Sequence, residues 1–117
     1  MRYTTKAMLA IGLVSTGVNA SEISHYEFDS ETLGASYPYT LYTPDGFEES
    51  DKRYPVMYLL HGSFGNENDW ASKGSLQETA DTLIEQGKIP PALIVMPGSQ
   101  SWWVDGHNEP AATAFIN

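Results

Sequence analysis

Pro55-Val56-Met57-Tyr58-Leu59-Leu60-His61-Gly62-Ser63-Phe64-Gly65 is the stretch that decides the fold of this 117-residue chain. Its first part, Val56 to Leu60, is apolar without alternation, and such a run predicts a parallel strand that is buried on both faces. Its second part is a loop bracketed by two glycines at the carboxyl end of that strand. Backbone N–H groups in a loop of this kind can be aimed at an anion.

A helix and a second strand are predicted after the loop. Ser75 is suited to cap the helix, with Glu78 in the first turn, and Gly87 followed by Pro90-Pro91 predicts its end. Residues 92–96 form another apolar run, which predicts a second buried strand. A strand, a helix and a strand in this order predict a right-handed crossover, the repeating unit of a doubly wound α/β sheet.

Two segments before the deciding stretch predict an antiparallel β-hairpin. They are residues 24–30 and 36–42, with a turn over 31–34. Pro38 predicts that the second of these strands is weak or lies at a sheet edge. Near the other end, Pro110 followed by residues 111–116 predicts the start of a helix. The expected fold class is therefore α/β: the N-terminal part of a doubly wound sheet with an antiparallel N-terminal hairpin.

Several short motifs, taken in order, resemble the putative-esterase family of α/β-hydrolases. They are Tyr54-Pro55, Leu60-His61-Gly62, Gly65, Trp70 and Leu93-Ile94-Val95-Met96-Pro97. That family includes feruloyl and acetylxylan esterases, S-formylglutathione hydrolases, enterochelin esterase-like proteins and antigen 85-like mycolyltransferases. The resemblance covers residues 36–117. It implies an α/β-hydrolase fold and a carboxylic ester hydrolase that works through a serine and an acyl-enzyme.

The resemblance implies a role for the backbone of Ser63, whose N–H would bind the oxyanion. Because the chain contains no Gly-x-Ser-x-Gly pattern, the nucleophile, acid and histidine of the triad are expected outside it. Residues 21–117 are thus expected to be the N-terminal portion of an esterase domain, truncated before the nucleophile elbow and inactive alone. Two alternatives for Ser63 stay open. The loop could be a tight turn that binds no ligand. Ser63 could instead be the nucleophile itself, because His61-Gly62-Ser63-Phe64-Gly65 departs from the elbow pattern only at its first position.

His61, Gly62 and Gly65 are expected to build this loop rather than to react. The resemblance implies that His61 belongs to the loop, with a catalytic role as the less favoured alternative. The two glycines are expected to supply backbone torsions that side chains resist. His107 is expected in a solvated loop, with substrate contact as its alternative, and His25 has no functional interpretation.

Aromatic side chains near the predicted ligand edge of the sheet are candidates for substrate binding. Trp102, Trp103 and Asp105 follow the second predicted strand, where doubly wound sheets bind ligands. The two indoles indicate a wall for an aromatic or sugar ring, and Asp105 a contact to a hydroxylated substrate. Core packing of the indoles and an ordinary loop carboxylate are the alternatives. Trp70 is expected to be a structural plug, although the resemblance implies a place close to the acyl pocket.

Residues 1–20 have the pattern of a secretory signal peptide. Arg2 and Lys6 precede a short apolar segment, and Val18-Asn19-Ala20 is a small-residue cleavage pattern. An uncleaved anchor helix is the alternative. We therefore expect an exported protein, periplasmic or secreted. Cleavage leaves four basic against fifteen acidic residues and lowers the formal charge from −9 to −11, which disfavours nucleic acid and an anionic membrane as partners.

The sequence offers no pattern for a metal or a cofactor. Cysteine is absent, and the three histidines lie far apart without ligand spacing. A glycine-rich phosphate-binding motif is also absent from the sequence. The expected partner is a small-molecule or polysaccharide-linked ester. The alternative function is a non-catalytic, exported carbohydrate-binding protein on a shortened α/β fold, with the tryptophans as a sugar platform.

Overall fold

The structure is a computed structural model that describes residues 20–100 and 103. Its elements are β1 (Glu22–Ser30), β2 (Ala35–Thr43), the 3-10 helix η1 (Phe47–Glu49), β3 (Val56–Tyr58), α2 (Asp69–Ser72), α3 (Leu76–Glu85) and β4 (Leu93–Pro97). Within these residues, no helix has the length and apolar character needed to cross a membrane. The signal peptide, except for Ala20, and the helix predicted from Pro110 lie outside the described residues.

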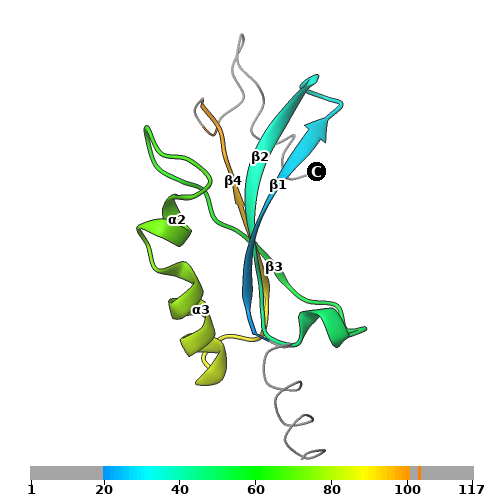
Figure 1. Ribbon diagram of the computed structural model, residues 1–117, viewed down its shortest axis with the longest axis vertical. Helices are drawn as coiled ribbons and strands as arrows, with labels where there is room; N and C mark the ends of the chain where they lie inside the picture. Colours follow the sequence, from blue (N-terminus) through cyan, green and yellow to red (C-terminus); the bar gives the residue numbers. More distant parts are fainter. Residues whose placement is uncertain (1–19, 101–102, 104–117) are drawn as a thin grey trace, which may run out of the picture.

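The strands form one mixed sheet in the order β1-β2-β4-β3 (Figure 1). β1 and β2 pair antiparallel from Glu22↔Thr43 to Ser30↔Ala35, which confirms the predicted hairpin. β4 pairs antiparallel with β2 and parallel with β3. The predicted unit of strand, helix and strand is therefore present as β3, α3 and β4, and it joins the hairpin through β4.

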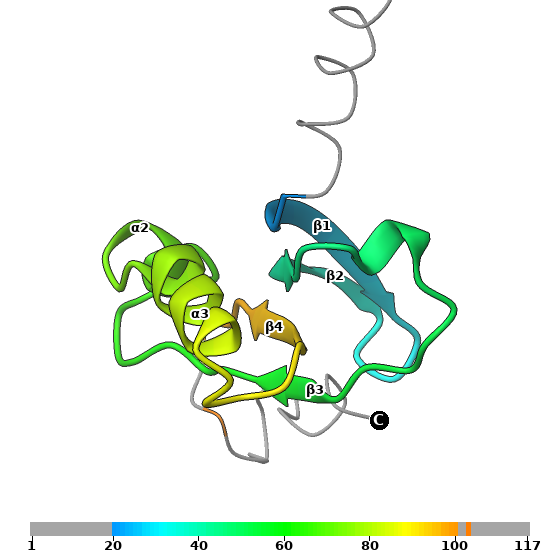
Figure 2. The same cartoon turned by 90° about the horizontal axis from the view of Figure 1, so that it is seen from below.

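The core lies between the sheet and α3. Tyr42 of β2 and Ile94 and Met96 of β4 are buried together with Ala80 of α3. Partly buried side chains extend this cluster, namely Ile23, Leu59, Leu76 and Ile84. Figure 2 shows both α2 and α3 on the same side of the sheet. The apolar spacing of α3 therefore directs one helical face onto β2 and β4, as the periodicity predicts.

The prediction that the first apolar run is a strand buried on both faces is wrong for β3. Val56, Met57 and Tyr58 keep 49%, 47% and 41% of their surface exposed. Among the described residues, β3 ends the strand order and pairs with β4 alone. It is also shorter than predicted, although the Leu59 N–H still donates to the Val95 carbonyl at 2.9 Å. The apolar run thus identifies the strand, but its burial depends on what lies beside it.

The ends of α3 confirm one predicted signal and correct another. Ser75 is the N-cap residue, but it has φ 50° and its hydroxyl makes no capping hydrogen bond. A capping serine needs an extended backbone to reach the first free N–H groups, so the left-handed conformation explains the difference. At the other end, Gly87 has φ 70°. Its N–H donates to Ile84 at 3.0 Å, and that of Lys88 donates to Leu83 at 2.9 Å, which is a Schellman motif.

Of the two expectations for Pro38, a place at a sheet edge is wrong. β2 lies between β1 and β4. The ladder with β4, however, ends at the pair Tyr39↔Pro97, and the Pro38 carbonyl accepts the Gly98 N–H at 2.9 Å just beyond it. Because proline has no N–H, the Pro38–Gly98 pair has only one of the two hydrogen bonds that such an antiparallel pair can form. The loss falls just beyond the end of the ladder between β2 and β4, where an interior strand tolerates it.

Candidate active site

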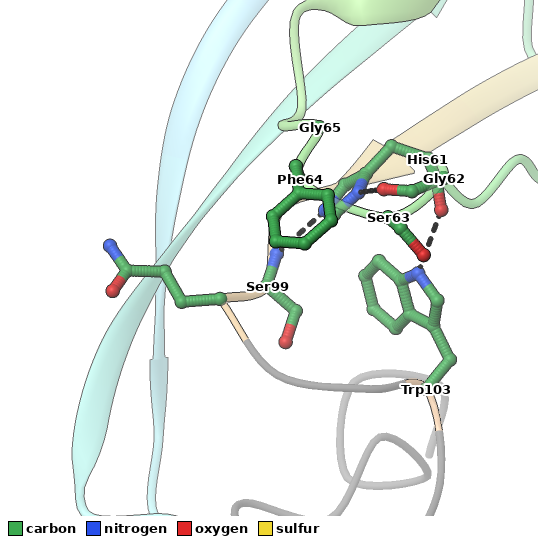
Figure 3. A pocket seen from close by; sticks show the side chains of 8 residues that line it. His61, Gly62, Ser63, Phe64, Gly65, Ser99 and Trp103 are labelled. Carbon is green, nitrogen blue, oxygen red and sulfur yellow. Dashed lines mark hydrogen bonds between the residues drawn. The ribbon is translucent and has the colours of Figure 1, made fainter.

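A cavity of about 560 Å³ opens beside the loop that follows β3 (Figure 3). One wall comes from the glycine-bracketed loop, and the other comes from residues just after β4. The lining residues are His61, Gly62, Ser63, Phe64, Gly65, Ser99, Gln100 and Trp103. Because β3 and β4 are parallel, both walls lie at the carboxyl ends of neighbouring strands, which is the ligand edge of open α/β sheets.

His61 ties the two walls of the cavity together. Its side chain is only 7% exposed, and its Nε2 accepts the backbone N–H of Ser99 at 3.1 Å. Because a backbone amide can only donate, the proton of the neutral ring is on Nδ1, which donates to the Gly62 carbonyl at 2.8 Å. Both ring nitrogens are therefore engaged with backbone groups.

Trp103 closes the cavity against the same histidine. Its indole N–H donates to the His61 carbonyl at 3.0 Å. The two rings meet edge to face, with centroids 5.0 Å apart. Figure 3 shows the indole next to Ser63. Trp103 is thus held as part of the wall by both a hydrogen bond and an aromatic contact.

The loop itself is a tight turn over residues 62–65. The Gly65 N–H donates to the Gly62 carbonyl at 3.0 Å, and Phe64 has φ 60°. A positive φ at the third residue only is the pattern of a type II turn, with Ser63 in the second position. Ser63 is exposed, and among the described residues no acceptor is paired with its N–H. The turn therefore leaves an unpaired backbone donor at a residue that lines the cavity.

The glycines of this turn serve a purpose different from the predicted one. Neither Gly62 nor Gly65 has a positive φ, so the expectation that both provide unusual torsions is wrong. Gly65 is needed for space, because a Cβ there would collide with Asp69 Oδ2 and lie 3.1 Å from the Gly62 carbonyl oxygen. Around a Cβ on Gly62 the space is open. Close packing of the turn on the start of α2 explains Gly65, while the structure gives no such reason for Gly62.

Phe64 occupies the conformation that glycine would normally take. A bulky residue in the left-handed region is an outlier whose strain amounts to about 1–3 kcal/mol. Burial does not offset this strain, because the side chain is fully exposed, at 108% of the reference surface. Phe64 is therefore both strained and unpacked at the mouth of the cavity.

Trp70 lies on the other side of the loop. Its indole N–H donates to the Leu60 carbonyl at 2.9 Å. Trp70 lines a smaller hollow of about 230 Å³, which shares His61 and Gly62 with the larger cavity. It is not among the residues that line the larger cavity. The contact with Leu60 fastens the strand end to α2, while the side chain stays partly exposed, at 38% of its reference surface.

The sequence model of the putative-esterase family matches residues 30–113. The chain belongs to this esterase family. Among curated proteins, the chain is 36% identical to an endo-1,4-beta-xylanase/feruloyl esterase of Xylanibacter ruminicola over 83 residues. The aligned region is 68% of this chain and 11% of that protein. The chain is 30% identical over 96 residues to an esterase of Mycobacterium tuberculosis, which covers 78% of the chain and 19% of that esterase. The chain thus spans a small part of both relatives.

Solved structures show that this esterase-family chain has an α/β-hydrolase fold. A ferulic acid esterase aligns with a TM-score of 0.66 and 32% identity, over 69% of this chain and 31% of that one. An S-formylglutathione hydrolase from Agrobacterium tumefaciens aligns with a TM-score of 0.56 over 81% of this chain and 30% of that one. At 19% identity, the second likeness concerns the fold alone. The four-stranded sheet therefore corresponds to one part of a larger α/β-hydrolase sheet.

The structure brings most of the predicted site residues of this esterase-family chain to one place. Ser63, Trp103 and the loop residues His61, Gly62 and Gly65 share the larger cavity, whereas Trp70 stands apart in the smaller hollow. Trp102, Asp105 and His107 lie outside the described residues.

The sequence reasoning missed three residues that line the cavity: Phe64, Ser99 and Gln100. For Ser99 and Gln100 a signal existed, because they directly follow the second predicted strand at its ligand edge. For Phe64, the sequence indicated only a neighbour of Ser63, since nothing in it announced a left-handed backbone.

The cavity is uncharged in a strongly acidic chain. None of its described lining residues is Asp, Glu, Lys or Arg, although the formal charge of the chain is −9. Within the described part, no group of three or more acidic, histidine or cysteine side chains is placed to hold a metal. The chemistry that this wall offers is hydrogen bonding by backbone donors next to aromatic surface.

Proposed function

We propose that this chain forms the anion-binding side of the active site of a serine carboxylic ester hydrolase. Its family is an esterase family, and one curated relative is named a feruloyl esterase. The Ser63 N–H is the proposed donor to the oxyanion. The attacking serine, with its acid and histidine, is proposed to come from outside these residues, because no Gly-x-Ser-x-Gly pattern occurs among them. Residues 21–117 alone are then inactive.

One observation carries this proposal: Ser63 is exposed and lines the cavity, and its N–H has no hydrogen-bond partner among the described residues. Buried or loop amides usually find a partner in the protein or in water. An amide held in a defined direction, at the ligand edge of an esterase-family sheet, is suited to receive a substrate oxygen. His61 and the Gly62–Gly65 hydrogen bond fix that direction.

In the proposed mechanism, the serine oxygen attacks the carbonyl carbon of the ester. As the new C–O bond forms, the electron pair of the carbonyl moves onto its oxygen, which accepts a hydrogen bond from Ser63. The catalytic histidine takes the serine proton and then gives it to the departing alcohol, which leaves an acyl-enzyme. Water cleaves this acyl-enzyme by the same steps, so the donor of the turn acts twice in each turnover.

The proposed substrate is a small-molecule or polysaccharide-linked ester met outside the cytoplasm. Support comes from the signal-peptide pattern of residues 1–20 and from a relative whose name joins xylanase and feruloyl esterase. The wall of Trp103, with Trp102 and Asp105 as further contacts, is proposed to hold that substrate, and Trp70 to support the loop from behind. The protein is accordingly proposed to be periplasmic or secreted.

The test separates the backbone donor from the hydroxyl of Ser63. Proline is favoured at the second position of a type II turn and lacks an N–H, so Ser63→Pro keeps the turn and removes the donor. Ser63→Ala keeps the donor and removes the hydroxyl. We expect Ser63→Pro to lower kcat for p-nitrophenyl butyrate by about a hundredfold to a thousandfold, and Ser63→Ala to stay within a few-fold of the wild type.

Both variants are made in the polypeptide encoded by the whole reading frame that contains this sequence. That reading frame is expected to encode Gly-x-Ser-x-Gly as well. Hydrolysis by purified residues 21–117 that Ser63→Ala abolishes would instead make Ser63 the nucleophile. Unchanged turnover in Ser63→Pro, with urea unfolding like that of the wild type, would remove the oxyanion role.

The alternative of a non-catalytic sugar-binding protein receives no support from the described residues. An indole platform for sugars needs an open ring face. The Trp103 N–H is used by His61, and its ring packs against the imidazole. Trp103 is therefore better placed as a wall than as a platform.

A further inference from the structure

The side chain of Phe64 is fully exposed, although its backbone is in the strained left-handed conformation. It is adjacent to the proposed oxyanion donor and lines the same cavity. Its backbone is left-handed, yet its ring is fully exposed, and Figure 3 shows the ring standing at the front of the site rather than folded into the core. A glycine would remove the strain of this position and would lose no packing against the described residues.

We propose that Phe64 is a specificity-determining contact that packs its ring against a flat ring of the substrate, next to the scissile carbonyl. This inference rests on the proposed function, because it places the ester carbonyl at the Ser63 N–H. The turn then has two tasks. Its second residue binds the developing charge, and its third residue holds the group attached to it.

The surroundings of Phe64 fit a flat and uncharged partner. The cavity holds two further rings, those of His61 and Trp103, and no charged side chain among its described lining. Stacked and edge-to-face contacts with aromatic rings, and packing on the apolar face of a sugar ring, need this kind of surface. An extended acyl chain gains less from such ring surfaces, since it presents no flat face to stack on them.

The position of the ring limits where the substrate ring can be. Phe64 directly follows Ser63, so its side chain starts one residue away from the oxyanion donor. A substrate ring in contact with Phe64 must then be joined to the carbonyl by a short link, on either the acyl or the alcohol side. The two sides share the same chemistry at Phe64, and the choice of substrates separates them.

The experiment compares Phe64→Gly and Phe64→Tyr with the wild type, in the protein from the whole reading frame. Methyl cinnamate carries its ring on the acyl side, an acetylated methyl xyloside carries a ring on the alcohol side, and methyl butyrate carries none. For one of the two ring-bearing esters, we expect Phe64→Gly to raise KM by about tenfold, the scale of one lost ring contact. For methyl butyrate, the rise in KM should be several-fold smaller than for that ester, and Phe64→Tyr should restore the low KM for the ring-bearing ester.

The urea unfolding midpoint of Phe64→Gly distinguishes a substrate contact from a purely structural role of Phe64. If Phe64 packs on the substrate, Phe64→Gly leaves the urea midpoint unchanged or raises it, because the glycine relieves backbone strain. If Phe64 instead packs on another segment of the complete enzyme, the same variant lowers the midpoint, and the inference is wrong. Tyr26→Leu, an exposed aromatic of β1 outside the cavity, is the matched control and should change neither KM nor the specificity.

The proposed function and this inference fail in different ways. A wild-type protein that hydrolyses none of the three esters contradicts the proposed function, and the Phe64 contact with it. Hydrolysis of methyl butyrate with equal KM changes for all three esters in Phe64→Gly keeps the esterase and removes the specificity role of Phe64.

Discussion

Tyr42 and Asp81 join the sheet to the helix that covers it: the phenol of Tyr42 in β2 donates a hydrogen bond to Asp81 Oδ1 of α3 at 2.7 Å. The other carboxylate oxygen accepts the Ser21 hydroxyl at 2.8 Å. Gln77, one turn earlier in α3, donates to the Ser21 carbonyl at 3.0 Å. Since Tyr42 is completely buried, this polar cluster is part of the packing between the hairpin and α3.

Removal of the phenol should destabilise the fold. We expect Tyr42→Phe to lower the free energy of unfolding by about 1.5–3 kcal/mol, because a buried bond to a charged acceptor is lost. Urea unfolding measures the change. Tyr26→Phe is the matched control, since that ring is 48% exposed, and it should stay within about 0.5 kcal/mol of the wild type. Equal losses in both variants would show that the buried bond contributes nothing specific.

The same tyrosine should make the fold sensitive to alkali. Burial, and then the hydrogen bond to Asp81, raise the pKa of Tyr42 far above its usual value of about 10. Below that value both states hold the proton, and this contribution to stability is fully present. Above it the unfolded chain loses the proton while the folded chain keeps it, so stability falls by up to about 1.4 kcal/mol per pH unit.

Urea unfolding at pH 9 and pH 11 tests this dependence. We expect the fall in the free energy of unfolding between the two pH values to be smaller in Tyr42→Phe than in the wild type. Tyr26→Phe should keep the full slope. If the slope is the same in all three proteins, the alkaline sensitivity does not come from Tyr42.

Gly65 and Gly62 should respond differently to the same substitution. A Cβ at Gly65 meets Asp69 Oδ2 and the Gly62 carbonyl, and Asp69 Oδ2 also accepts the Asn66 N–H at 3.2 Å. Gly65→Ala must therefore displace these groups, and we expect it to lower the free energy of unfolding by about 1–3 kcal/mol. Gly62→Ala meets open space and should stay within about 1 kcal/mol of the wild type. A reversed order of the two variants contradicts the packing of the turn.

His61 should prove to be a support for the site rather than its base. His61→Phe keeps a flat ring but leaves the Ser99 N–H without its acceptor, so we expect a loss of about 1–3 kcal/mol in stability together with reduced turnover. His61→Gln offers an oxygen in place of Nε2 and should recover most of both. The midpoint of the pH dependence of kcat/KM should be the same in His61→Gln and in the wild type. A shifted midpoint would assign the proton transfer to His61.

Local patterns predicted the secondary structure well where the outcome depends on near neighbours in the chain. The hairpin of β1 and β2 followed from alternation and a turn, and Gly34 closes that turn with φ 65°. The end of α3 at Gly87 followed from the one residue type that enters the left-handed region without strain. Such features are determined within a few residues, so the sequence displays them directly.

The errors concern positions where distant segments or the backbone conformation decide. Ser75 has a side chain suited to a helix cap, but its backbone is left-handed and its hydroxyl makes no capping hydrogen bond. Val56, Met57 and Tyr58 are as apolar as a buried strand requires, yet the sheet order leaves them at the end of the described strands. In each case the residue type fits the prediction, but the sequence does not show the backbone conformation or the neighbouring strands that decide the outcome.

By itself, the sequence determined the strands, the helix, the crossover and the turn that carries Ser63, because hydrophobic periodicity and glycine positions act over short distances. Only the tertiary structure decided that His61 links this turn to Ser99 and Trp103, that Gly65 is required for space, and that Phe64 stands strained and bare beside the cavity. These facts depend on how β3 and β4 lie next to each other, and contacts between segments so far apart in the chain leave no periodic trace in the order of amino acids.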